Sequence, residues 1–350
     1  MLRGMSPSKN RNGARDLRGA GRLAIDATTR VTGIVEEMHH TIGGFPARLF
    51  SAPVYAIIRG ITKVAGKSLD LALERLEGVV GEGAPGAERD ALVAALNGIV
   101  GDHLQATQNP LAITMRLRHD GAPRPRVVVL IHGSSMSDRQ WRREGHDHGE
   151  ALARDLDASA IYATYNSGLH VEDNGRQLAV LLEEALAAWP VPVESIVLLG
   201  HSMGGLVARS AIAHAEKLSW RKQLRALVTL GTPHHGAPLE RIGHLVQLLG
   251  GVSRYSAPIA KAGNLRSAGV MDLRHGLALP LPTDVACFAL AATSTKSAGA
   301  RRLAGDGLVP VVSSHGEFPE ANRAIAYGVT HLGLLCANVY PTILAWLTTI

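Results

Sequence analysis

Ser202 lies in a pattern that can turn a serine hydroxyl into a nucleophile. The chain reads Gly-His-Ser-Met-Gly-Gly over residues 200–205, directly after the apolar run Ile196–Leu199 and before a helix-forming run. This arrangement is typical of a sharp, strained strand-to-helix turn that exposes the serine Oγ. A side chain at position 200 or 204 would clash with the nearby chain, which explains why both residues are glycine. The N–H of Met203, at the helix start, is then placed to stabilise an oxyanion.

A nucleophilic serine also needs a base and an acid that orients the base. In parallel-sheet proteins with this turn, the three follow the order Ser, acid, His. Asp306 lies in a glycine-flanked loop after the apolar run Val285–Ala292, where a strand end is expected. His331 follows 25 residues later, just before the helical run Leu334–Leu347. The sequence therefore predicts a catalytic set of Ser202, His331 and Asp306.

Other residues could fill the same roles. The alternative bases are His315, His234 and His235, and the alternative acids are Glu240 and Asp272. His315 follows Asp306 by only nine residues, and both alternative acids fall in an expected insertion. Asp-Gly is also a common solvated turn pair, which is the plain alternative for Asp306.

The loop after the first central strand is expected to supply a second oxyanion donor. After the run Val127–Ile131 the chain reads His-Gly-Ser, and we assign the donor to the N–H of Ser134, to within one residue. Further candidate substrate contacts follow strands or flank these motifs: His132, His201, His235 and Leu169. For the loop that contains Leu169, a plain connection explains the sequence equally well.

Apolar runs of strand length alternate with helical patterns beyond residue 110. The expected strands are 127–131, 161–163, 196–199, 227–230 and 285–291, and the expected helices are 149–156, 175–188 and 204–217. Alternation of this kind predicts an α/β fold with a doubly wound, mostly parallel sheet. Leu111–Leu117 alternates apolar and polar residues, which favours a further half-buried strand.

Residues 236–284 are long for a connection, so we expect a cap insertion over the site. Within it, apolar residues spaced over Leu239–Leu249 indicate an amphipathic helix. Packing of the whole insertion on a sheet edge is the alternative. The predicted organisation is a disordered tail at 1–13, a helical region at 14–110 and the α/β domain at 111–350.

The helical region at 14–110 has three interpretations. It can dock on the α/β domain, bind a membrane surface or form an oligomer contact. The basic, amphipathic pattern at Ala14–Ile42 fits a lipid surface, although amphipathic helices more often pack on protein.

Composition narrows the class of protein. The 350 residues carry a formal net charge of +6 and are 46% hydrophobic, which favours a folded core. We find no nucleic-acid motif, no secretory signal pattern and no apolar stretch of membrane-spanning length, so we expect a cytoplasmic protein, with peripheral membrane contact left open. Cys287 and Cys336 lie in apolar runs and are read as buried thiols.

Two motifs are not expected to bind a ligand. Gly60–Ser68 has five residues between its glycines where a phosphate-binding loop has four. His146-Asp147-His148 offers too few ligands for a metal, and Asp147 is expected to cap a helix. We predict no metal and no cofactor.

Four motifs in chain order carry a resemblance to a known family. They lie at 131–133, 200–205, 230–236 and 305–310. Together they resemble bacterial lipase/esterase-type α/β-hydrolases, especially the PGAP1-like branch related to GPI-inositol deacylases, over residues 111–350. The resemblance implies Ser202, Asp306 and His331 as the triad, with backbone donors at Met203 and Ser134. It also implies hydrolysis of a carboxylic ester, such as a lipid or acyl ester. An acyltransferase with the same triad and a non-catalytic binding protein of this fold are the alternatives.

Overall fold

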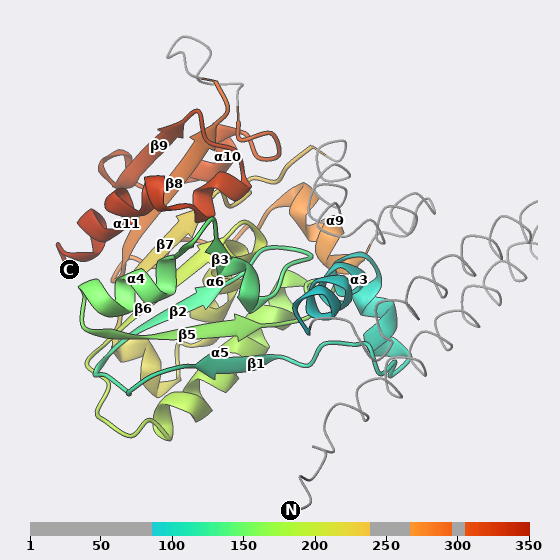
Figure 1. Ribbon diagram of the computed structural model, residues 1–350, viewed down its shortest axis with the longest axis horizontal. Coiled ribbons are helices and arrows are strands. Elements are labelled where there is room, and N and C mark those ends of the chain that lie inside the picture. The colour runs from blue at the N-terminus through green and yellow to red at the C-terminus, as the bar shows by residue number, and fades with distance from the viewer. Residues whose placement is uncertain (1–85, 239–266, 296–304) are drawn as a thin grey trace, which may run out of the picture.

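A seven-stranded sheet forms the centre of the molecule (Figure 1). The computed structural model describes residues 86–238, 267–295 and 305–350. The strand order is β1-β5-β2-β6-β7-β8-β9, with β1 antiparallel to β5 and every other pair parallel. The bounds are β1 Arg116–His119, β2 Arg126–Ile131, β5 Ala158–Thr164, β6 Ser195–His201, β7 Leu224–Leu230, β8 Ala286–Thr293 and β9 Arg323–Tyr327. The predicted α/β fold with a mostly parallel sheet is confirmed.

Helices cover the sheet in two layers. In one layer α4 (His148–Asp155) lies beside α11 (Tyr340–Leu347), and the rings of His148 and Tyr340 stack at 6.0 Å. In the other, α5 (Val171–Ala187) packs on α6 (Met203–His214) (Figure 1). Because helices cover both faces, the central strands β2, β6 and β7 are buried almost throughout. This explains why their sequences are continuous apolar runs rather than alternating ones.

Shorter elements surround this core. They are the two-residue strands β3 (Arg142–Arg143) and β4 (His146–Asp147), and the helices α9 (Ala268–His275) and α10 (Val311–His315). The short 3-10 helices are η1 Asp138–Trp141, η2 Ser219–Lys222, η4 Glu320–Asn322, η5 Leu332–Leu335 and η6 Ala337–Val339. The Asp147 carboxylate accepts hydrogen bonds from the N–H groups of Gly149 and Glu150, so the predicted helix cap is confirmed.

Helix α3 (Gly86–Ala106) precedes the sheet in the sequence and lies within the region 14–110 that the sequence predicts to be helical. It is interrupted at Val100, whose φ of −135° is not helical. A small apolar cluster forms on it and comprises Leu96, Ile99, Val100, Leu104 and Leu111. The predicted tail at 1–13, the pattern at 14–42, the motif at 60–68 and the cap helix at 239–249 lie outside the described residues.

The strand expected at 111–117 is wrong in position, because β1 begins only at Arg116. Asparagine side chains hold the preceding segment instead. Asn109 accepts a hydrogen bond from the N–H of Leu111, and Asn97 of α3 accepts one from that of Ile113. These backbone groups are therefore not available to a sheet ladder at that point.

The C-terminal end also differs from expectation. The predicted helix over 334–347 divides into η5, η6 and α11, and Pro341 occupies the first turn of α11. Proline lacks a backbone N–H and starts helices more readily than it continues them. Strand β9 was not predicted, because its half-buried sequence Arg-Ala-Ile-Ala-Tyr is short and weakly patterned.

Within the described ranges, no helix has the length and apolar composition needed to cross a membrane. Neither cysteine is in a disulfide; Cys287 is buried and Cys336 is half-buried.

Candidate active site

Ser202 occupies a strained turn between β6 and α6. Its φ is +54° and its ψ is −124°, a backbone conformation that residues with a Cβ rarely adopt. Its N–H donates to the oxygen of Leu230, which ties the turn to β7. A Cβ on Gly204 would overlap the backbone oxygen of Ile131, and a Cβ on Gly200 would lie 2.5 Å from the Cα of Gly205. The two glycines therefore allow the close approach that the sequence predicts.

Asp306 and His331 form a buried pair. The distance from His331 Nδ1 to Asp306 Oδ2 is 2.7 Å, and both side chains are 1% exposed. The other carboxylate oxygen, Oδ1, accepts from the N–H groups of Leu308 and Val309 at 2.9 and 2.8 Å. A carboxylate only accepts, so His331 Nδ1 carries the proton. This leaves Nε2 as an acceptor, and within the described ranges that buried atom has no hydrogen-bond partner.

Two contacts join this pair to the serine turn. The side chain of His201, the residue before Ser202, donates from Nε2 to the backbone oxygen of His331 at 3.1 Å. The two imidazole rings lie 4.8 Å apart. Gly231, which follows β7, is so close that a Cβ there would lie 3.1 Å from Asp306 Oδ2 and 3.2 Å from His331 Cε1. The carboxyl ends of β6 and β7 thus meet the loops that carry the acid and the histidine.

The loop after β2 packs on the serine. A Cβ on Gly133 would lie 3.1 Å from the Cβ of Ser202 and 3.2 Å from His201 Nδ1. The N–H of Ser135 is engaged, since it donates to Ser167 Oγ at 2.9 Å. This bond favours the N–H of Ser134 over that of Ser135 as the candidate oxyanion donor. Met203 begins α6, so its N–H lies in the first turn of a helix.

His132 does not fit its predicted role as a substrate contact. The ring is fully buried and stacks on Tyr165 at 4.3 Å. Nδ1 donates to the oxygen of Gly133, and Nε2 accepts from the N–H of Tyr165. Burial lowers the pKa of His132 to about 4. With both ring nitrogens used by the backbone, the residue packs and orients the loop, and the prediction is corrected.

The other three predicted substrate contacts differ in their exposure to solvent. His201 is fully buried, and burial together with nearby His331 holds its pKa well below the usual range, so it supports the histidine loop rather than meeting a ligand. His235 is exposed and lines a pocket of about 560 Å³ with Arg274 and Ser313. Leu169 is half-buried at the end of the loop after β5.

Three of the alternative acids and bases are engaged elsewhere. His315 donates to the oxygen of Ala324, and buried His234 contacts Arg209 and Thr229. Asp272 accepts from the ring of His170 and the N–H of Val171. Glu240 lies outside the described residues.

Sequence reasoning missed the residues that hold the loop after β2, residues 132–137, from outside; we name it the oxyanion loop for its candidate role. Ser167, on the loop after β5, supports Ser135, and Gly98 of α3 lies against Ser135. A serine in a loop and a glycine in a helix carry no signal of such a role. In the described part of the chain, no three His, Cys, Asp or Glu side chains form a group that could hold a metal ion.

The sheet order and the strand–turn–helix at Ser202 define an α/β-hydrolase fold. Residues 122–280 match the family model described as PGAP1-like alpha/beta domain. The chain therefore has an α/β-hydrolase fold, and its residues 122–280 are similar to the PGAP1-like domain.

Comparison with known proteins gives partial matches. A triacylglycerol lipase from Pseudarthrobacter phenanthrenivorans is 31% identical over 114 residues, which is 31% of this chain and 34% of the lipase. A GPI inositol-deacylase from Schizosaccharomyces pombe is 38% identical over 68 residues, 19% of this chain and 6% of that protein. The aligned part thus spans about a third or less of these relatives.

Among solved structures, the lipase BlEst2 from Bacillus licheniformis in its propeptide form has the same fold. Its TM-score is 0.50 at 21% identity, with 68% of this chain and 54% of the lipase covered.

Proposed function

We propose that this protein is a serine hydrolase that cleaves carboxylic esters, with a lipid or acyl ester as substrate. The observation that carries the proposal is the buried hydrogen bond between Asp306 and His331. It leaves His331 Nε2, next to the Ser202 turn, as an acceptor without a partner among the described residues. The lipase and deacylase relatives support the substrate class.

In this mechanism, His331 Nε2 takes the proton of the Ser202 hydroxyl as Oγ attacks the ester carbonyl carbon. Asp306 holds the ring and stabilises the imidazolium that forms. The N–H groups of Met203 and Ser134 donate to the negative oxygen of the tetrahedral intermediate. When the intermediate collapses, His331 gives its proton to the alcohol, which leaves. Water then attacks the acyl-serine by the same route, and the free acid is released.

Hydrolysis of p-nitrophenyl esters of graded acyl length tests this proposal, with wild type beside Ser202→Ala. We expect turnover that depends on the serine, with a loss on the order of 10⁶, as seen when triad serines are removed in other enzymes. Product analysis with an added alcohol separates water from another acyl acceptor. Equal turnover by both proteins would exclude Ser202 as the nucleophile.

A further inference from the structure

Helix α3 precedes the stretch that matches the family model, yet it contacts the loops of the candidate active site. In Figure 1 it lies beside α9 at one end of the sheet. Its contacts centre on six residues around the interruption at Val100, from Asn97 to Asp102. We name these residues the α3 kink.

The α3 kink lies directly against the oxyanion loop. A Cβ on Gly98 would overlap the hydroxyl of Ser135 and would lie 2.8 Å from its Cα. The side chain at 98 therefore has no room, and the helix backbone forms the wall behind Ser135. Ser135 itself has a φ of +59°, which is uncommon for a residue with a Cβ. A residue in this conformation needs support from its surroundings.

The same kink bonds the next loop along the sheet. The Nδ2 of Asn166 donates to the backbone oxygen of Gly101 at 2.9 Å. A Cβ on Gly168 would overlap the oxygen of Asn97. Ser167, between these two residues, is the one that accepts from the Ser135 N–H. Helix α3 thus fixes Ser135 directly and also fixes the loop that holds its N–H.

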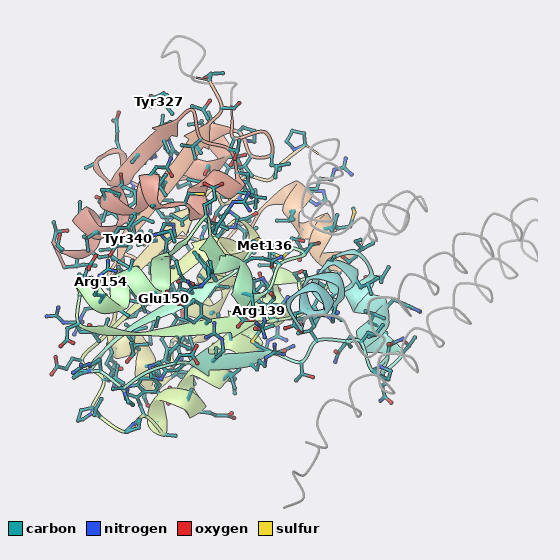
Figure 2. The ribbon with its side chains drawn as sticks, viewed as in Figure 1. Met136, Arg139, Glu150, Arg154, Tyr327 and Tyr340 are labelled. Atoms are coloured by element: carbon teal, nitrogen blue, oxygen red, sulfur yellow. The ribbon has the colours of Figure 1, made fainter. Side chains whose placement is uncertain are left out.

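A third segment, at the start of α9, also bonds to α3. The Ser267 hydroxyl donates to the oxygen of Gly98 at 2.7 Å, and the N–H of Ala268 donates to Asp102 at 3.0 Å. Further along α3, Asp90 forms an ion pair with Arg139, which Figure 2 labels beside the helix. The loops after β2 and β5 and the start of α9 therefore share one support.

We propose that the α3 kink is a positioning element for the oxyanion donor at Ser134. This inference rests on the proposed function, because it assigns Ser134 its place in the reaction. The helix backbone fills the space behind Ser135 and sets the direction in which the preceding N–H points. A shift of that N–H by a few tenths of an ångström weakens its hydrogen bond to the transition-state oxygen. The kink then acts on kcat rather than on substrate binding.

The test compares Gly98→Ala with Gly175→Ala. Gly175, in α5, is a matched control because a Cβ there would also overlap a serine hydroxyl, that of Ser210, away from the oxyanion loop. We expect Gly98→Ala to lower kcat for p-nitrophenyl esters tenfold to hundredfold with KM changed less than about twofold, since complete loss of one donor elsewhere costs 10²–10³. We expect Gly175→Ala to keep kcat within about threefold when both variants are assayed well below their melting temperatures.

Hydrogen exchange supplies a readout that does not need activity. We expect faster exchange in a peptide covering 131–137 of Gly98→Ala, with exchange in a peptide covering 195–201 unchanged. Adding Ser135→Gly to Gly98→Ala removes the overlapping Cβ and Oγ and should recover part of the lost kcat. Unchanged exchange at 131–137, or faster exchange with wild-type kcat, overturns the positioning role. An inactive wild type with the expected exchange pattern would instead refute the proposed function and leave the contact intact.

Discussion

The ring of His201 is joined to the backbone of His331 by a hydrogen bond of 3.1 Å from Nε2 to the carbonyl oxygen. A carbonyl oxygen only accepts, so His201 carries its proton on Nε2. Burial and the neighbouring His331 keep the pKa of His201 well below its usual range. The residue before the proposed nucleophile therefore stays neutral and fixes the position of the histidine that is proposed to serve as base.

Replacing His201 tests this relationship. In His201→Phe the oxygen of His331 loses its donor in a buried place, which costs about 1–3 kcal/mol and lets the histidine loop shift. We expect kcat to fall about tenfold to hundredfold. His201→Gln keeps an N–H donor at a similar position and should lose clearly less. If Phe and Gln variants have the same kcat, the hydrogen bond has no part in positioning the base.

The hydrogen bonds of Asp306 predict an unusual effect of Asp306→Asn. The N–H groups of Leu308 and Val309 require an acceptor at Oδ1, so the new amide must turn its NH₂ group toward His331. His331 Nδ1 then accepts, its proton moves to Nε2, and it can no longer take the proton of Ser202. We expect kcat to fall on the order of 10³–10⁴ with the fold intact.

Asp272→Asn is the matched control for that variant. Asp272 also pairs with a histidine, His170, at 3.1 Å, but outside the candidate site. The kcat of Asp272→Asn should match that of wild type. A value for Asp306→Asn above a tenth of wild type would contradict the proposed role of the carboxylate.

The strained backbone at Ser202 is expected to lower the free energy of unfolding of the protein. At a φ of +54° a residue with a Cβ is strained, whereas glycine is not. We expect Ser202→Gly to be more stable than Ser202→Ala by about 1 kcal/mol, after allowing for the greater freedom of glycine in the unfolded chain. Urea unfolding of the two inactive variants measures the difference. An alanine variant as stable as the glycine variant would show that the turn is unstrained.

Buried histidines predict weaker stability in mild acid. Burial lowers the pKa of His132 and His148 from 6.5 to about 4, and the pKa values of His201 and His234 lie well below 6.5. Between about pH 4 and 6.5 the unfolded chain binds protons that the folded chain excludes, so stability falls as pH falls. His132 and His148 should each lower the free energy of unfolding by about 2 kcal/mol between pH 7.5 and 5, and His201 and His234 should act in the same direction.

Urea unfolding at pH 7.5, 6 and 5 measures this dependence. His148→Gln removes one titrating ring while keeping a donor for the oxygen of Leu334, so its decline should be shallower than that of wild type. The same free energy of unfolding at all three pH values would show that the folded protein protonates these histidines as readily as the unfolded chain does.

Local sequence predicted the central strands and the Ser202 turn because the physical cause is itself local. A strand covered on both faces must be apolar throughout, and a turn this tight must have glycine where backbone approaches backbone. The candidate acid and base could be placed by chain order alone. The Asp306–His331 hydrogen bond then joins residues that motif order had already selected.

Contacts between distant segments were beyond the same reasoning. His132 follows a strand like a site residue, but the ring of Tyr165, 33 positions later, makes it part of the core. The alternation at 111–117 looks like a strand, but Asn97, in an earlier helix, accepts a hydrogen bond from the N–H of Ile113. Neither partner can be identified until the chain is folded.

The bonds of Asn97 also determine where the chain can be divided. Its side chain donates to the oxygens of Val93 and Leu111 and accepts from the N–H of Ile113. It therefore joins α3, before residue 110, to the segment that leads into β1, after residue 110. A protein cut between residues 110 and 111 would keep the strands and the serine. It would expose Leu111 and leave the loops after β2 and β5 and the start of α9 without their shared support. The smallest piece that folds with its site intact therefore includes α3.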